Sequence, residues 1–304
     1  MLLSRNTYAV MLCARACIGT LLLLLSWHTH AEIEVTDDSG DPIRLAQPAR
    51  RIISLAPNLT ELLFAAGAGT KIVGTVSHSD YPAAASQIPL IGDSFNLDIE
   101  AIITLQPDLI LLWQSGTGEP AWRKLKALGL TVYRAEPDTL EKIATSLERF
   151  GQLADTSAIA NNRSRELREQ IAQLGKRYTH KPVIQVFYQF WDKPIYTVNG
   201  QHLISHIIEL CGGQNIYADL GTLTPRINPE SVLERNPEVI IASGEDETPP
   251  VWLDYWKQWP ELTATQRNQI FYIPPDYLQR HTPRVMTGAT RVCEYIDRAR
   301  QTAR

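Results

Sequence analysis

The chain has 304 residues, of which 44% are hydrophobic and 20% are charged, and its formal net charge is −4. This length allows two domains of ordinary size, and the composition is that of a globular protein. The excess of acidic residues argues against a nucleic acid as partner, because phosphate backbones are bound through clustered lysine and arginine.

The first 31 residues have a different composition from the rest of the chain. Arg5 and Arg15 precede a short apolar run over residues 18–27, and Ala31 follows. This order predicts a secretory signal peptide over residues 1–31, cleaved after Ala31. A membrane anchor is the alternative, but the run is too short to span a bilayer. Cleavage would leave 27 basic and 33 acidic residues, a net charge of −6.

Two cysteines remain after the predicted signal peptide, Cys211 and Cys293. In an exported protein an even number of cysteines favours a disulfide, and two buried free thiols are the alternative. The disulfide would close a loop of roughly eighty residues and contribute on the order of 4 kcal/mol to stability.

Strands and helices alternate through the first half of the exported chain. A hairpin is predicted over residues 33–45. Strands are then expected at 51–55, 72–76, 109–112 and 131–135, and helices at 57–67, from about 98, at 119–128 and at 140–154. Asn58 or Thr60 is the expected N-cap of the first helix. This alternation predicts a mainly parallel sheet with helices on both faces.

One long helix is predicted over residues 156–177, about 30 Å in length. The segment is rich in Glu, Arg, Gln and Ala, and its apolar residues have helical spacing. We therefore expect a rigid connector rather than a flexible linker. The predicted division is an N-terminal lobe over 32–154, a linking helix over 155–178 and a C-terminal lobe over 179–304.

The second half repeats the strand and helix pattern, and one unit occurs in both halves. Residues 97–113 and 227–243 each contain a short helix, a turn at a proline and an apolar strand. Glu100 and Glu230 fall at equivalent positions in the two copies. Further strands are predicted at 183–188 and 270–273, and further helices at 202–211 and from about 283.

The chain lacks the common catalytic motifs, including Gly-x-Ser-x-Gly, His-Glu-x-x-His and Cys-x-x-Cys. Residues 67–71 faintly resemble a phosphate-binding loop, but a helix-to-strand turn explains them better. His202 and His206 have a spacing that can bind zinc, yet no third ligand lies nearby. The sequence therefore predicts no catalytic residues, no metal site and no resident cofactor.

The informative polar and aromatic residues follow the ends of predicted strands. In open α/β sheets, ligands bind beyond the carboxyl ends of the strands. This aromatic set suits a large, flat, partly apolar ligand held between two lobes, although packing between lobes is an alternative for the two tryptophans. The candidates are His78, Tyr81, Trp113, Phe190, Trp191, Tyr196, Asp276, Tyr277, Arg280 and His281.

Several segments carry a family resemblance that covers nearly all of the exported chain. They are residues 51–67, Ser79-Asp-Tyr-Pro82, Leu210-Cys-Gly-Gly-Gln-Asn-Ile216 and Arg280-His-Thr-Pro-Arg284. These segments resemble the periplasmic cobalamin-binding members of the helical-backbone class of ABC-transporter binding proteins, a class that also serves haem and ferric siderophores.

The resemblance implies an α/β fold with two Rossmann-like lobes, each a mainly parallel sheet flanked by helices, joined by one long rigid helix. It implies a monomeric periplasmic protein that captures a corrinoid in the cleft between the lobes. The partner would be an ABC importer, a permease dimer with its ATPase subunits. A haem or ferric-siderophore carrier is the alternative within the class. An exported α/β enzyme and a chelatase-like or sensor-like interaction module are alternatives from other classes.

The resemblance also implies residue roles. His78 matches a ligand-contacting tyrosine of the first lobe, and the two cysteines match a disulfide. Glu100 and Glu230 match acidic residues that dock onto arginines of the permease, although stabilisation of their helix N-termini is an alternative. The chain departs from the family pattern at residues 93–96 and at Thr224. Both are expected to lie in the cleft, so these departures affect which ligand is predicted. A ligand-contacting loop of the second lobe matches Asp276, Tyr277, Leu278, Gln279 and Arg280.

Overall fold

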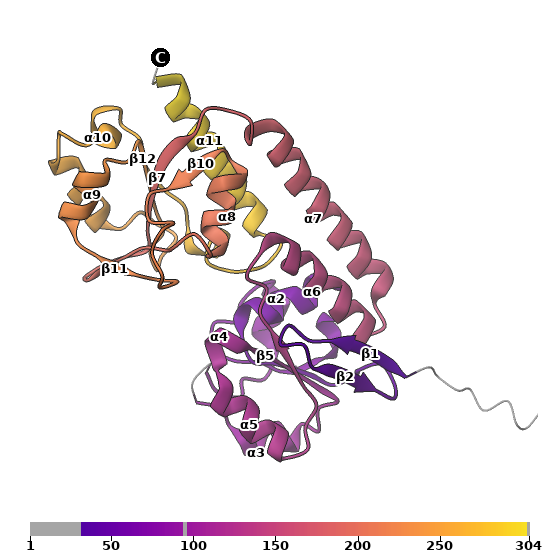
Figure 1. Cartoon of the computed structure of the whole chain (residues 1–304). Helices are drawn as coiled ribbons and strands as arrows, with labels where there is room; N and C mark the ends of the chain where they lie inside the picture. Colours follow the sequence, from indigo (N-terminus) through magenta and orange to yellow (C-terminus); the bar gives the residue numbers. More distant parts are fainter. Residues whose placement is uncertain (1–31, 94–95, 303–304) are drawn as a thin grey trace, which may run out of the picture.

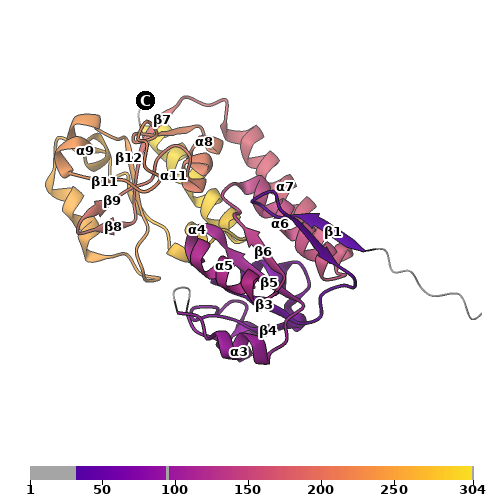
Figure 2. The ribbon, with the colours of Figure 1, turned by 60° about the horizontal axis from the view of Figure 1, so that its bottom comes forward.

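The computed structural model describes residues 32–93 and 96–302, so the predicted signal peptide lies outside the described residues. The chain forms two α/β lobes (Figure 1). A 22-residue helix, α7 (Ser157–Tyr178), runs between the two lobes, as the sequence predicts. Figure 2 shows from a second direction that α7 lies along helix α6 (Leu140–Leu153) of the first lobe.

The first lobe is built on a four-stranded parallel sheet of order β4-β3-β5-β6. Its strands are β3 (Ile52–Ser54), β4 (Ile72–Gly74), β5 (Leu109–Trp113) and β6 (Val132–Ala135). An antiparallel hairpin, β1 (Ile33–Thr36) and β2 (Pro42–Leu45), precedes it as predicted. The other helical elements are α2 (Pro57–Ala65), η1 (Gly69–Lys71), η2 (Ala83–Gln87), α3 (Ile99–Thr104), α4 (Gln114–Thr117) and α5 (Glu119–Ala127).

The second lobe has a parallel sheet of the same form, with order β10-β7-β12-β13. Its strands are β7 (Ile184–Gln189), β10 (Gly213–Asn215), β12 (Val239–Ala242) and β13 (Ile270–Tyr272). A small antiparallel sheet of β8 (Trp191–Asp192), β9 (Ile195–Tyr196) and β11 (Arg226–Ile227) lies outside the sequence prediction. The helices are α8 (Leu203–Leu210), α9 (Pro229–Arg235), η3 (Val251–Gln258), α10 (Thr263–Gln266), η4 (Pro275–Tyr277) and α11 (Val285–Thr302).

The sequence repeat is a structural repeat. Strands β5 and β12 occupy the same place in the two sheets. At the start of β5, the Asp108 carboxylate accepts hydrogen bonds from the backbone N–H groups of Arg50 and Arg51, at 2.8 and 2.9 Å. At the start of β12, the Glu238 carboxylate accepts one from Gln185 N–H at 3.0 Å. Equivalent acidic side chains therefore join each repeated unit to the neighbouring strand.

The continuous apolar runs of β5 and β12 follow from helices on both faces of each sheet. In β5, Leu109 and Leu111 face one hydrophobic core, and Ile110 and Leu112 face another. Helices α2 and α6 cover the first of these faces, and α3 and α5 cover the second. The first core also contains Leu167 of α7 and continues into the second lobe, so α7 is packed rather than free.

The start of α2 differs from the prediction. The helix begins at Pro57 with Ala56 as the N-cap residue, and no side chain caps it. Proline is favoured at the first helical position because its missing N–H and its fixed φ fit there. Asn58 and Thr60 therefore lie inside the helix, and the Thr60 hydroxyl contacts the backbone of Ala56 instead.

The disulfide between Cys211 and Cys293 is confirmed, with the two Cα atoms 4.6 Å apart. It ties the end of α8 to α11. Gly212 follows α8 with φ of +68°, and a Cβ atom there would meet the Tyr178 carbonyl oxygen at 2.6 Å. Glycine is thus required at this helix end.

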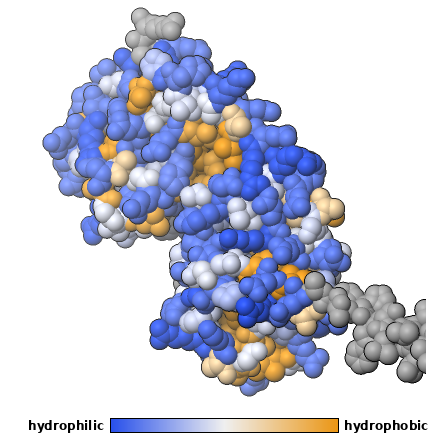
Figure 3. Space-filling view, turned by 45° about the vertical axis from the view of Figure 1, so that its right-hand side comes forward, coloured by the Kyte–Doolittle hydropathy of each residue, from blue (hydrophilic) through white to orange (hydrophobic). Residues whose placement is uncertain are grey.

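The surface of the face shown in Figure 3 is mostly hydrophilic, with hydrophobic side chains gathered in patches on both lobes. Among the described residues, no helix combines the length and the apolar character that crossing a membrane requires.

Candidate functional site

The cleft between the lobes contains two adjoining hollows, which share Trp113, Phe190 and Gln279 in their walls. The outer hollow has a volume of about 560 Å³, and the inner hollow about 340 Å³. The outer hollow is also lined by Pro57, Asn58, His78, Trp191, Gly244, Glu245, Pro275, Asp276 and Arg280. The inner hollow is also lined by Ser115, Glu136, Asp138, Tyr188, Val198, Gln201, His202, Leu203, Ile204, Leu223, Thr224 and His281.

The shared aromatic residues come from the carboxyl ends of strands, where the sequence analysis expects a ligand. Trp113 is the last residue of β5, and its indole Nε1 donates a hydrogen bond to Glu136 at 3.2 Å. Phe190 follows β7 directly and is stacked between Tyr188 and Tyr196, with ring centroids 6.4 and 5.9 Å away. Both aromatic walls are therefore held in fixed orientations.

Arg280 connects the two lobes at the outer hollow. Its Nε lies 2.7 Å from an Asp276 carboxylate oxygen of the second lobe. Its Nη1 lies 3.0 Å from Asp80 of the first lobe and donates a hydrogen bond to the His78 carbonyl at 3.3 Å. His78 is exposed and has φ of 64°, a left-handed conformation that is uncommon outside glycine. Arg280 thus helps to hold the loop that presents His78 to the cleft.

Four of the predicted ligand-contacting residues lie outside the two hollows. Tyr81 lines a third hollow, where an arginine guanidinium lies 3.9 Å from its ring centroid. Tyr196 stacks behind Phe190. Leu278 is fully buried, and Tyr277 packs against the core. Packing explains Tyr196, Tyr277 and Leu278, whereas Tyr81 is 44% exposed. The contact of all four with a ligand stays a prediction.

The structure adds Asn58 to the outer hollow. Its side chain is 5% exposed, and neither of its polar atoms has a hydrogen-bond partner among the described residues. A buried amide without partners is costly, so Asn58 is suited to bind a polar group of a ligand. A polar residue beside Pro57 is typical of a helix cap, so no pattern in the sequence indicates that Asn58 lines the hollow.

Two histidines form one wall of the inner hollow. The rings of His202 and His281 have their centroids 6.0 Å apart, and His281 also meets the Trp113 ring at 6.0 Å. His202 is the N-cap of α8, and its Nδ1 accepts a hydrogen bond from Ile204 N–H at 3.2 Å. Burial lowers the pKa of each histidine to about 4. Both rings are therefore neutral at pH 7.

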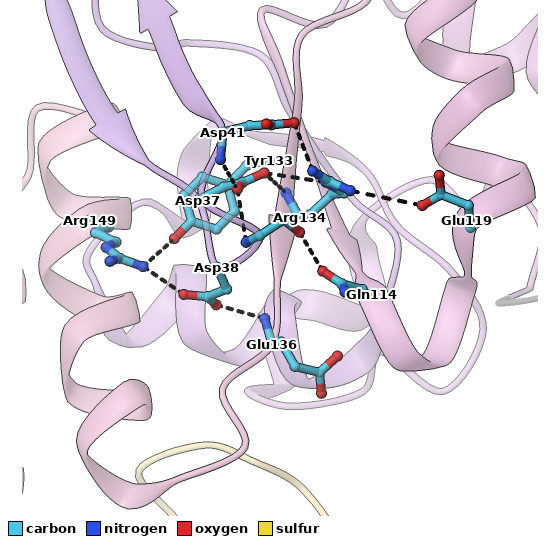
Figure 4. Close-up of polar contacts among 10 residues, drawn as sticks. Asp37, Asp38, Asp41, Gln114, Glu119, Tyr133, Arg134, Glu136 and Arg149 are labelled. Atoms are coloured by element: carbon cyan, nitrogen blue, oxygen red, sulfur yellow. Dashed lines mark hydrogen bonds and ion pairs between the residues drawn. The ribbon is translucent and has the colours of Figure 1, made fainter.

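Glu136 is one of two acidic residues that line the inner hollow, and the predicted hairpin turn positions it (Figure 4). Its backbone N–H donates to the Asp38 carboxylate at 2.6 Å, and Asp38 is paired with Arg149 at 2.6 Å. Arg134, two residues before Glu136, is paired with Asp41 at 2.7 Å. These contacts join the hairpin to β6 and α6 and fix the chain at the end of β6.

The family follows from a comparison with known proteins. The sequence pattern described as periplasmic binding protein matches residues 52–277, which is most of the chain. The chain belongs to the periplasmic binding protein family. The vitamin B12-binding protein of Vibrio parahaemolyticus is 34% identical over 252 residues, covering 83% of this chain and 90% of that one. That of Vibrio cholerae is 36% identical over 256 residues, covering 82% and 90%.

Solved structures of periplasmic binding proteins confirm the fold. The periplasmic vitamin B12-binding protein of Vibrio cholerae superposes with a TM-score of 0.76 at 35% identity, covering 83% of this chain and 98% of that one. The periplasmic haem-binding protein of Roseiflexus has a TM-score of 0.68 at 22% identity, covering 83% and 99%. The second likeness concerns the fold alone.

Two further observations complete the description of this periplasmic binding protein. Glu100 and Glu230 each lie exposed in the first turn of a helix, α3 and α9, and line neither hollow. Their helices are capped by other residues, Asp98 and Asn228. Within the described ranges, no cluster of three or more histidine, cysteine or acidic side chains is suited to hold a metal ion.

Proposed function

We propose that this periplasmic binding protein captures a corrinoid such as cobalamin in the cleft and delivers it to an ABC importer. The observation that carries the proposal is the match to vitamin B12-binding proteins, which extends over more than four fifths of the chain at 34% and 36% identity. The aromatic walls support it, because flat apolar ligand surfaces pack well on aromatic rings. The corrinoid is cargo, and the protein needs neither a resident cofactor nor a catalytic step.

Titration of the purified protein with cyanocobalamin, haem and a ferric siderophore tests the proposal directly. The optical spectrum of the protein after removal of free ligand reports which compound stays bound. We expect retention of one cyanocobalamin per chain, recovered with unchanged mass. Retention of haem or of the siderophore alone would assign the protein to another branch of the family. A covalently changed product would contradict a purely binding role.

We infer that the ligand lies against His78, Trp113, Phe190, Trp191, Asp276, Gln279 and Arg280, with Asn58 as an additional contact. These residues surround the outer hollow. Tyr81, Tyr196, Tyr277 and Leu278 support the walls or contact the ligand at its edge.

A neutral imidazole of His78 is suited to coordinate the metal of the ligand. Replacement of His78 by alanine would then change the absorption spectrum of the bound corrinoid. An unchanged spectrum would refute coordination without affecting the binding proposal.

We propose that Glu100 and Glu230 dock onto the importer. Their equivalent, exposed positions in two similar lobes suit a permease dimer that presents the same basic surface twice. The binding protein would act as a monomer, since its two lobes already supply both contacts. A single-chain mass in light scattering, with and without ligand, checks this expectation.

We further propose that the exported chain divides into an N-terminal lobe over residues 32–154, a linking helix over 155–178 and a C-terminal lobe over 179–304. We also propose that residues 1–31 direct export to the periplasm and are then removed. N-terminal sequencing of protein from the periplasmic fraction should begin at Glu32. A retained leader would contradict cleavage after Ala31.

A further inference from the structure

The carboxylate side chains of Glu136 and Asp138 lie among the aromatic and aliphatic residues that line the inner hollow. Glu136, Asp138 and His281 line it, and no lysine or arginine is among its lining residues in the described chain. Lys142 pairs with Asp138 at 2.7 Å, but it does not itself line the hollow, and both side chains of this pair are more than one third exposed. The hollow therefore offers two carboxylates and a buried ring to a ligand group.

Glu136 is held as a hydrogen-bond acceptor. Its carboxylate receives the Trp113 indole N–H at 3.2 Å, the Ser115 backbone N–H at 2.8 Å and the Ser115 hydroxyl at 2.9 Å. The carboxylate oxygens of Glu136 are the acceptors in all three contacts, and the residue also lines the hollow.

His281 adds a buried ring nitrogen to the wall of the hollow. Its Nδ1 has no hydrogen-bond partner among the described residues, and the residue is only 8% exposed.

A buried polar nitrogen without a partner is unfavourable, and a ligand group that hydrogen-bonds to it would remove this cost. The neighbouring His202 offers a donor, because its Nδ1 already accepts from Ile204 and its Nε2 carries the proton in the neutral ring. The hollow thus presents the carboxylate acceptors of Glu136 and Asp138 together with a neutral donor.

We propose that the inner hollow is a specificity subsite that takes a primary carboxamide of the ligand and excludes a carboxylate. The proposal rests on the corrinoid function and deepens it. A carboxamide has two N–H donors for the carboxylate oxygens of Glu136 and Asp138, and an oxygen for the neutral donor. A carboxylate has no N–H donor for these oxygens, and it meets the negative charge of Glu136 and that of Asp138, the second of which is partly offset by Lys142. The subsite would select fully amidated corrinoids over their acid forms.

The test compares cyanocobalamin with the six monocarboxylic acids in which one of its primary side-chain amides is hydrolysed. Dissociation constants are measured at pH 7 for the unaltered protein. We expect at least one acid to bind more than fivefold more weakly, because only the acid group that enters the hollow is penalised. If all six acids bind within fivefold of cyanocobalamin, the proposal is wrong.

Two variants locate the selectivity in the hollow. In the double variant Glu136→Gln and Asp138→Asn, the ratio of the dissociation constant of the weakly bound acid to that of cyanocobalamin should fall below fivefold. Glu209→Gln removes one negative charge from an exposed position of α8 and should keep the original ratio. A ratio above fivefold that survives in the folded double variant, or one that disappears in Glu209→Gln, would overturn the assignment. Failure of the unaltered protein to bind cyanocobalamin at all would instead count against the corrinoid function.

Discussion

Replacement of Glu61 by glutamine removes one charge from a buried ion pair that joins the two lobes. Glu61 belongs to α2, and its side chain is 3% exposed. Its carboxylate accepts two hydrogen bonds from the Arg284 guanidinium, both at 2.8 Å, and one from the Thr282 hydroxyl at 2.6 Å. Arg284 precedes α11 and lies 223 positions further along the chain.

The expected loss of stability follows from these contacts. Removing one partner of a buried ion pair typically costs about 3–5 kcal/mol, because the other charge stays buried without compensation. Arg284 is 17% exposed and keeps Asp276 at 3.3 Å, so part of its charge remains paired. Glutamine also retains the shape of the side chain and one acceptor oxygen. We therefore expect Glu61→Gln to lower the free energy of unfolding by about 2–4 kcal/mol.

Urea denaturation of the ligand-free protein, followed by circular dichroism, measures this loss. The matched control is Glu34→Gln, which breaks the pair between Glu34 and Arg44, whose side chains are 52% and 58% exposed. Solvent and salt screen a pair so exposed, so this variant should change stability little. A loss below about 1 kcal/mol for Glu61→Gln would refute the reasoning, since it would show that the interior pair contributes no more than a surface one.

Three further predictions concern other parts of the molecule. Glu100→Ala or Glu230→Ala should weaken binding to the importer by about 2–5 kcal/mol if the docked ion pair is buried. Either variant should leave the affinity for cyanocobalamin unchanged. A reduced affinity for cyanocobalamin would place the two glutamates in the cleft instead. Lowering the pH from 6.5 to 4 should lower the free energy of unfolding by about 3 kcal/mol for each of His202 and His281. The pKa of each histidine is about 4 in the folded protein and 6.5 in the unfolded chain. In this pH range the unfolded chain therefore binds protons that the folded protein does not. A pH-independent unfolding free energy in that range would contradict this. Replacing both cysteines of the disulfide by serine should cost about 4 kcal/mol, seen as a lower Tm, and an unchanged Tm would exclude a stabilising role.

The sequence was sufficient to predict the elements whose pattern is local. Strands β5 and β12 were predictable because each is a short, fully apolar run bounded by turn residues. Helix α7 was predictable from a long segment of good helix formers without early glycine. Strands β8 and β9 have only two residues each, which is too short for any periodicity, and they form only by pairing with each other and with β11.

The site was predictable where it depends on strand ends, and less so where it depends on contacts between lobes. Trp113 and Phe190 were found because they follow apolar strands. The ion pair of Glu61 depends on Arg284 in the other lobe, and no local sequence pattern indicates that contact. The neutral state of His202 depends on burial by residues distant in the sequence, so its spacing to His206, which can bind zinc but lacks a third ligand nearby, does not indicate it.

The packed helix α7 and the interior contact between Glu61 and Arg284 have a consequence for binding kinetics. The first hydrophobic core continues from one lobe into the other through α7, and the ion pair joins the lobes at a second place. The cleft walls are thereby preorganised in the ligand-free chain, and association requires no preceding domain closure. We expect a single-exponential approach to saturation whose rate rises linearly with ligand concentration, so that differences in affinity among ligands arise mainly from their dissociation rates.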